Sequence, residues 1–118
     1  MATAVKRLLS GSTDGKNIQI TASADPGNLI HTAVASTTAG TYDEIWLAAN
    51  LVGAQGCVLV LEFGGNSGVD LITYTLTTGL GLVPILNGMI LQNSEVVRAY
   101  CSLPNYVGIL GFVNSITD

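Results

Sequence analysis

The stretch that most constrains the fold is residues 41–65, which reads TYDEIWLAANLVGAQGCVLVLEFGG. Two apolar segments, 45–51 and 57–63, flank residues 52–56, which include two glycines. Glycine reaches the positive backbone angles that a chain reversal needs, so the pattern predicts a hairpin of two strands. Residues 57–61 are apolar at every position, which predicts a strand that is covered on both faces. A β core is therefore expected in the middle of the chain.

The rest of the chain also has the pattern of a β protein. Turn signals recur about every ten residues, and no segment has the apolar period of an amphipathic helix. Pro84 cannot donate a hydrogen bond to a sheet, so residues 80–86 are expected to form an edge strand or a bulge, and Asn87-Gly88 is expected to form a tight hairpin turn. The other predicted strands are 16–21, 29–35, 70–77, 89–92, 95–101 and 106–113.

These eight or nine strands predict an all-β fold, an antiparallel β-sandwich with a jelly-roll-like arrangement. With 118 residues, the chain has the size of one domain. We divide it into an N-terminal arm with the first turn, residues 1–14, and a single sandwich domain, residues 15–118. Within the arm, residues 4–9 are expected to be a short strand or an extended segment.

The low charge content is the most informative feature of the composition. Charged residues make up 10% of the chain, whereas about 25% is usual. A chain that buries much of its exterior against partners has little need of Lys and Glu, so we expect an interaction protein that forms a homo-oligomer. A monomer with a surface rich in Thr and Ser is the alternative.

Composition also argues against two classes of partner. The formal net charge is −4 with four Lys and Arg in total, whereas a groove that follows phosphates needs clustered cations, so no nucleic acid is expected. Residues 71–94 carry no charge, but their alternating threonines and their glycines favour strands over a membrane-spanning helix, so no membrane is expected. The apolar run after Arg7 is too short for a secretion signal, which predicts a protein made in a cytoplasm.

No set of residues predicts catalysis, a cofactor or a metal site. His31 is the only histidine, and we expect a structural imidazole because one ring cannot assemble a site. Residues 65–68 and 11–17 only partly imitate a nucleophile elbow and a phosphate loop, and no helix is expected after either. Glu62 and Asp70 flank a turn and are expected near each other, but calcium needs about six to eight oxygens, so we interpret them as solubility charges. We therefore expect no enzyme.

We expect the cysteines and the tryptophan to have structural roles. Cys57 and Cys101 are expected as buried free thiols, and a disulfide between them requires that their strands be neighbours. Trp46 lies between two aliphatic residues, so we expect it in the core. The alternative is a carbohydrate platform that Trp46 would form with the tyrosines, Tyr42, Tyr74, Tyr100 and Tyr106.

Several segments resemble small virion proteins of tailed bacteriophages. They are KRLLSGSTDGKNIQI near the start, IHTA at 30–33, YDEIWLAA at 42–49, LEFGG at 61–65, VPILNGMIL at 83–91, VVRAY at 96–100 and GFVNSI at 111–116. The resemblance covers nearly the whole chain and consists of turn and core patterns. It implies a capsid decoration or cement protein, a β-sandwich, often trimeric, on the outside of the shell.

This resemblance implies the partners and the location. The major capsid protein or another virion protein is the expected partner, and the expected location is the virion, after synthesis in the bacterial host cytoplasm. The predicted partner-binding residues are Lys6, Arg7, Leu8 and Leu9, with the two cations meeting an acidic patch of the shell. A tail, collar or head-tail joining subunit is one alternative, and a carbohydrate-binding or receptor-binding module is another.

Overall fold

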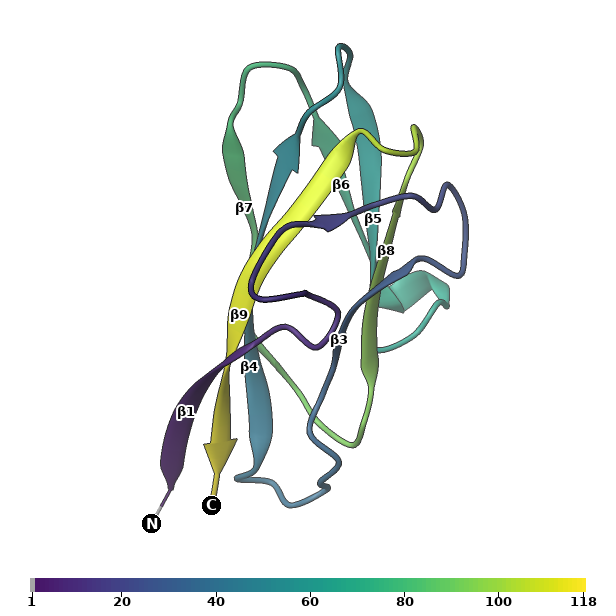
Figure 1. Cartoon of the computed structure of the whole chain (residues 1–118). Coiled ribbons are helices and arrows are strands. Elements are labelled where there is room, and N and C mark those ends of the chain that lie inside the picture. Colours follow the sequence, from purple (N-terminus) through teal and green to yellow (C-terminus); the bar gives the residue numbers. More distant parts are fainter. Residues whose placement is uncertain (1) are drawn as a thin grey trace.

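A computed structural model describes residues 2–118, and in this part of the chain the fold is all-β. Figure 1 shows an elongated sandwich, with extents of 48 × 27 × 20 Å, in which both ends of the chain lie at the same end of the molecule. A short 3-10 helix, η1, spans Gly68–Asp70. The strands are β1 (Thr3–Leu8), β2 (Ile18–Gln19), β3 (Asn28–Thr32), β4 (Tyr42–Leu51), β5 (Cys57–Phe63), β6 (Leu71–Leu76), β7 (Leu82–Leu91), β8 (Val96–Cys101) and β9 (Val107–Thr117).

The strands pair as they would in one long hairpin that has been rolled up. β5 pairs with β6, β4 with β7, β3 with β8 and β2 with β9, all antiparallel. Rolling this hairpin gives two sheets, here called sheet A, in the order β1-β9-β4-β7 with β2 also on β9, and sheet B, in the order β3-β8-β5-β6. This is the strand arrangement of a jelly roll, so the predicted sandwich is confirmed.

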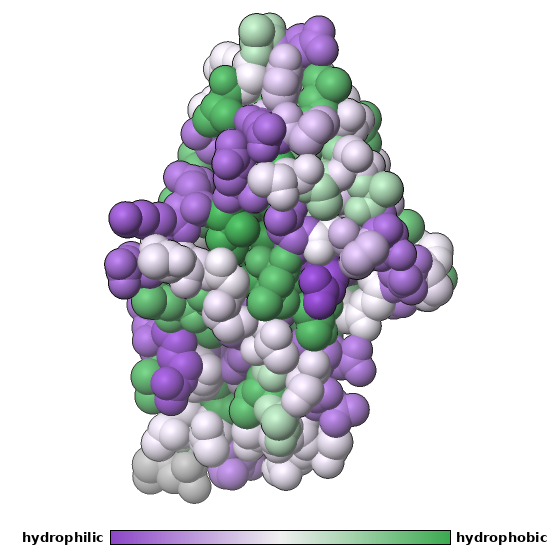
Figure 2. Space-filling model, turned by 45° about the vertical axis from the view of Figure 1, so that its right-hand side comes forward, coloured by the Kyte–Doolittle hydropathy of each residue, from purple (hydrophilic) through white to green (hydrophobic). Residues whose placement is uncertain are grey.

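The core lies between the two sheets. Ile45, Leu47 and Ala49 of β4 alternate with partly exposed residues and point inward from sheet A. Leu59 and Leu61 of β5 point inward from sheet B, and both are fully buried. Period-two alternation therefore sets which side chains enter the core. Outside the core, Figure 2 shows apolar residues exposed among polar ones on the side that it presents.

The structure corrects the prediction for β5 and its connection to β4. The outer face of β5 is open at its first residues, because Val58 is 37% exposed and Val60 is partly exposed. The alternation is hidden in the sequence because valine occupies the outer positions as well. The predicted hairpin through residues 52–56 is also wrong, since β4 and β5 belong to different sheets and this segment crosses between them.

The prediction of a hairpin turn at Asn87-Gly88 is wrong as well. β7 continues through both residues as the edge strand of sheet A, and its register with β4 shifts between Ile45 and Trp46. Gly88 has a φ of +82°, so the favourable backbone of this dipeptide is used in a bulge instead of a turn. The prediction of an edge strand at Pro84 is confirmed, and a second register shift lies beside it.

The first strand extends sheet A beyond the eight strands of the jelly roll. Thr3–Leu8 pairs with the last part of β9, from Thr117 back to Phe112, so this segment is a strand, the first of the two forms expected. Every residue of β1 is exposed. Met1, the first residue of the predicted arm, lies outside the described residues. Among residues 2–118, no helix has the length and apolar character needed to cross a membrane.

Candidate interaction surface

The outer face of sheet A is unusually poor in charge. The register places residues of four strands in rows across this face, and Lys6 and Glu44 are the only charged residues among them. Most of the others are apolar, and Leu8, Leu82 and Ile90 are each more than half exposed. The apolar members are Ala4, Leu8, Tyr42, Trp46, Ala48, Leu82, Pro84, Ile90, Leu110, Phe112 and Ile116. A largely apolar, exposed face of this kind is typical of a binding surface.

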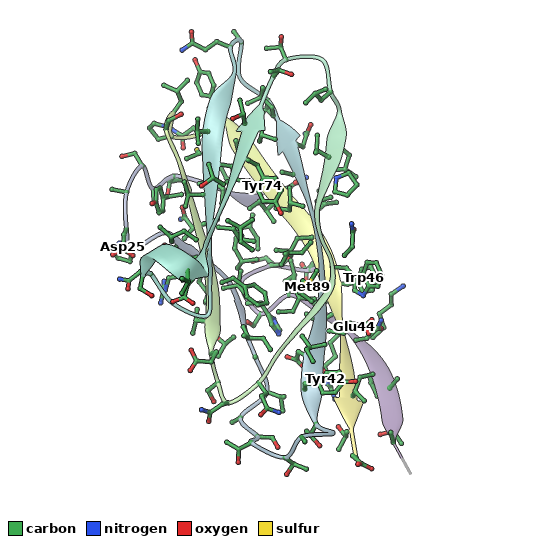
Figure 3. All side chains as sticks on the ribbon, turned by 180° about the vertical axis from the view of Figure 1, so that it is seen from behind. Asp25, Tyr42, Glu44, Trp46, Tyr74 and Met89 are labelled. Atoms are coloured by element: carbon green, nitrogen blue, oxygen red, sulfur yellow. The ribbon has the colours of Figure 1, made fainter. Side chains whose placement is uncertain are left out.

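Two aromatic rings form the centre of this face. Trp46 and Phe112 are register partners on β4 and β9, and their rings are stacked with centroids 6.0 Å apart and planes 9° from parallel. The ammonium group of Lys6 lies 4.3 Å from the centre of the Phe112 ring, a distance that allows a cation–π contact. Figure 3 shows that Trp46 projects away from the sandwich, whereas Tyr74 lies between the sheets.

Polar contacts hold the indole of Trp46 in place. Its Nε1–H donates to Glu44 Oε1 at 2.9 Å, and the amide of Asn114 donates to the same oxygen at 3.1 Å. These two hydrogen bonds, that of Trp46 first, lower the pKa of Glu44 below its ordinary value. The Glu44 carboxylate therefore remains charged into moderately acidic solution and keeps the ring oriented.

A glycine and a shallow hollow complete the surface. A Cβ on Gly88 would lie 3.0 Å from the Trp46 ring, so the ring packs directly against the backbone of the bulge. Next to the rings is a hollow of about 270 Å³, lined mainly by apolar side chains, which include those of Leu82, Pro84 and Leu110. Such a hollow can accept an apolar side chain of a partner.

The structure separates the four predicted partner-binding residues. Lys6 and Leu8 lie on the outer face of sheet A, beside Phe112. Arg7 is exposed but points to the opposite side of β1, because neighbouring residues of a strand alternate. Leu9 is 1% exposed and belongs to the core, so its side chain is not available to a partner in this structure. Lys6 and Arg7 therefore do not form one cationic patch.

The prediction that Trp46 lies in the core is wrong. Ile45 and Leu47, its neighbours in sequence, point inward, and Trp46 points outward between them. The alternation of residues 43–49 contained this signal, since Ile45, Leu47 and Ala49 share one parity and Trp46 has the other. Apolar flanks alone were therefore a poor guide to the orientation of the indole.

His31 is a structural imidazole, as predicted. It lies on β3 and is 5% exposed, and its Nδ1 accepts the Ser10 N–H at 3.0 Å. Its Nε2 then carries the proton and donates to Asp43 Oδ2 at 2.7 Å. Asp43 also accepts hydrogen bonds from Ser115 Oγ and the Val34 N–H. Both ring nitrogens are used, so the imidazole links the two sheets and has no free nitrogen to act as a base.

The two cysteines are free and buried. They lie on β5 and β8, which are neighbours in sheet B, and Cys101 Sγ donates to the Leu103 carbonyl at 2.8 Å. Burial raises the pKa of both thiols. The prediction of buried free thiols is confirmed.

Glu62 and Asp70, which flank the 64–68 turn, lie near each other as expected, because Glu62 is the register partner of Leu71, the residue after Asp70. Each carboxyl has a different hydrogen-bond partner. Glu62 accepts a hydrogen bond from the Gly27 N–H at 2.7 Å, and Asp70 accepts one from Ser67 Oγ. The carboxyl group that lines the same hollow as Glu62 on the facing loop is that of Asp25, which no sequence pattern indicated. Among residues 2–118, no group of three or more His, Cys, Asp or Glu side chains is placed to hold a metal ion.

With the fold and the surface described, comparison with known proteins adds no relative: no protein-family model, curated protein or solved structure matches this chain. The class of protein that fold and surface define is a jelly-roll sandwich with one exposed apolar sheet face.

Proposed function

We propose that this chain is a structural interaction protein that forms homo-oligomers and decorates a bacteriophage capsid, where it acts as a cement. The observation that carries the proposal is the outer face of sheet A, where Trp46 and Phe112 are surrounded by exposed apolar side chains and only two charges. Burial of such a face against a partner is favourable, at about 25 cal/mol for each Å² of apolar surface. The sequence resemblance to virion proteins supports the choice of partner.

A cement protein needs no catalysis. It binds the assembled lattice of capsid subunits more tightly than the separated subunits, and the binding free energy then opposes expansion or rupture of the shell. The major capsid protein is the proposed partner, and the virion is the proposed location. A trimer is the proposed state, in which each copy of a closed ring covers part of its neighbour's apolar face and leaves the edge at β1 to the shell.

Strand β1 is the proposed contact with the shell. All of its residues are exposed, and it carries Lys6 and Arg7, whereas the whole chain has a net charge of −4. The two cations face opposite sides of the strand, so we propose that only Lys6 acts together with the aromatic pair. An acidic patch on the shell would attract this edge of sheet A.

The experiment is co-sedimentation with purified shells of a phage that encodes the protein. Ile90→Lys places a charge on the outer face of sheet A at a residue that is 55% exposed, so the fold should tolerate it. Thr75→Lys makes a matched change at an exposed residue on the outer face of sheet B. The proposal predicts loss of retention for Ile90→Lys and normal retention for Thr75→Lys. Equal retention of the two variants would contradict it.

A tail, collar or head-tail joining subunit is the proposed alternative within the virion. It uses the same apolar face, but in a single closed ring instead of many clusters over the shell. Electron microscopy of labelled virions separates the two, because many three-fold clusters indicate decoration and one ring indicates a joining or tail role.

A carbohydrate-binding or receptor-binding module is a second candidate, favoured by the partly exposed aromatic pair. The face of Trp46 can stack on a sugar ring, and Glu44 and Asn114 supply polar atoms beside it. Of the tyrosines, Tyr74 is not part of this surface, because its hydroxyl donates to the Ile85 carbonyl across the gap between β6 and β7. Glycan-array binding that disappears in Trp46→Ala, while shell binding persists, would favour this candidate over the first.

A further inference from the structure

Glu62 is a buried carboxyl on what would otherwise be an open sheet face. It points to the outer side of sheet B, because Leu59 and Leu61 of the same strand point into the core. It is nevertheless only 3% exposed. The connection between β2 and β3, residues 20–27, lies against it, and the Gly27 N–H donates to its Oε1. This β2–β3 loop therefore acts as the cover of the carboxyl.

Further contacts fasten the loop to its surroundings. Asp25 and Glu62 line the same hollow beside the loop. A hydrogen bond between their carboxyl groups, which needs a shared proton, contributes to the opposite shifts of their two pKa values. The amide of Asn66 donates to Asp25 Oδ2 at 3.0 Å, and Arg98 Nη1 donates to the Gly27 carbonyl at 3.3 Å. The backbone also fits closely, since a Cβ on Gly27 would lie 2.3 Å from the Ala99 carbonyl oxygen.

The charges around this pair are unbalanced. Arg98, from β8, is the only cation among the residues that line the adjacent hollow of about 300 Å³, and Glu95, from the turn before β8, lines the same hollow. Asp70, from η1, lies against Gly65 at the rim, where its Oδ2 would be 2.6 Å from an added Cβ. If the pair loses its proton, one guanidinium faces several carboxylates.

We propose that Asp25 and Glu62 form a pH-sensitive latch, which holds the β2–β3 loop on sheet B while they share a proton and frees the loop when the proton leaves. An ionised Glu62 would be buried beside the ionised Asp25, and both burial and like charge disfavour that state. Release of the loop exposes Glu62 to water and widens the hollow.

The direction of the pH dependence follows from the two carboxyls. Burial, followed by the hydrogen bond with Asp25, raises the pKa of Glu62 in the folded chain, so its contribution to stability is lost as pH rises through the raised value. The hydrogen bond from Glu62, followed by that from Asn66, lowers the pKa of Asp25, so its contribution is lost as pH falls through the lowered value. The latch is therefore strongest between these two transitions and weakens as pH rises through the raised pKa of Glu62.

Hydrogen exchange of the Gly27 amide tests the latch directly, because this N–H is bonded to Glu62. NMR of the full chain from pH 5 to pH 8, with the intrinsic exchange rate divided out at each pH, gives its protection. We expect a severalfold loss of protection as pH rises. In Glu62→Gln the side chain still accepts from Gly27 and donates to Asp25 but cannot ionise, so its protection should not change with pH.

Two further variants complete the test. Asp70→Asn removes a nearby carboxyl outside the pair, and it should retain the pH dependence of the wild type. In Asp25→Asn the amide can donate to an ionised Glu62, so the pH dependence of Gly27 protection should be smaller than in the wild type. This variant tests the latch if Glu62→Gln does not fold. The proposal would be overturned if the protection of the Gly27 amide in the wild type did not change with pH. It would also be overturned if folded Glu62→Gln or Asp25→Asn kept the pH dependence of the wild type.

Discussion

Substitution of Asp43 by alanine tests how the sandwich is held together at its polar centre. The Asp43 side chain is 4% exposed and accepts hydrogen bonds from three donors, His31 Nε2, the Val34 N–H and Ser115 Oγ. Through them it connects sheet A to sheet B. Asp43→Ala removes the common acceptor and leaves the His31 Nε2–H without an acceptor, while Nδ1 keeps the Ser10 N–H.

The expected loss follows from the exposure of each donor. A buried donor without a partner costs about 1–3 kcal/mol, and this applies in full to His31, whose side chain is 5% exposed. Val34 and Ser115 are partly exposed, so water can replace their acceptor and each loss is smaller, at most about 1 kcal/mol. We therefore expect Asp43→Ala to lower the free energy of unfolding by about 3 kcal/mol, which corresponds to a fall in Tm of about 10 °C.

Glu44→Ala is the matched control, because it removes the next carboxylate in the same strand on the solvent side. Urea denaturation of both variants, at one protein concentration and with the slope m compared, gives the two losses. Asp43→Ala should be much less stable than Glu44→Ala. Equal losses would refute the view that the buried network, and not carboxylates in general, joins the sheets.

Two more predictions follow from single residues of sheet A. Gly111→Ala places a Cβ 2.0 Å from the Trp46 carbonyl oxygen, so urea denaturation should show a loss of about 2 kcal/mol or more in the free energy of unfolding. Gly68→Ala is the control and should be nearly neutral, because nothing lies within 4 Å of its Cβ. A larger loss for Gly68→Ala than for Gly111→Ala would contradict the close packing of β9 on β4. The fluorescence of Trp46, the only tryptophan, should change as Glu44 gains a proton, with a midpoint below the ordinary value of 4.5 because the pKa of Glu44 is lowered. The contribution of the Glu44 carboxylate to stability is lost as pH falls through that midpoint. A midpoint at or above 4.5, or the same fluorescence transition in Glu44→Gln, would show that the hydrogen bond between Glu44 and the indole does not cause the change.

Local patterns predicted much of the fold from sequence. The alternation of threonines along 71–77 correctly indicated a strand, β6, in which Thr73 and Thr75 are exposed, and Pro84 correctly marked an edge. These signals come from the backbone chemistry of a single strand and do not require knowledge of its neighbours. The jelly-roll arrangement was expected from the number of strands. The pairing of the strands was not predicted, and the structure shows it to be that of one long hairpin folded back on itself.

The features that sequence patterns missed depend on contacts between distant segments. Glu62 is buried only because the loop that carries Asp25 crosses the outer face of sheet B, and no local pattern encodes that crossing. Asn87-Gly88 has the backbone preference of a turn, but pairing with β4 on one side makes it a bulge. The exposed aromatic pair was visible only after β4 and β9 were placed side by side, with Trp46 opposite Phe112.

The most direct test of the central claim is the mass of the isolated protein in solution. If the outer face of sheet A exists to be covered by copies of the chain, sedimentation equilibrium of the wild type should give a multiple of the 12.2 kDa chain mass, with three copies as the proposed state. Ile90→Lys should dissociate this oligomer, and Thr75→Lys should leave it intact. A monomer over the whole accessible concentration range, for the wild type as well as the variants, would contradict the account.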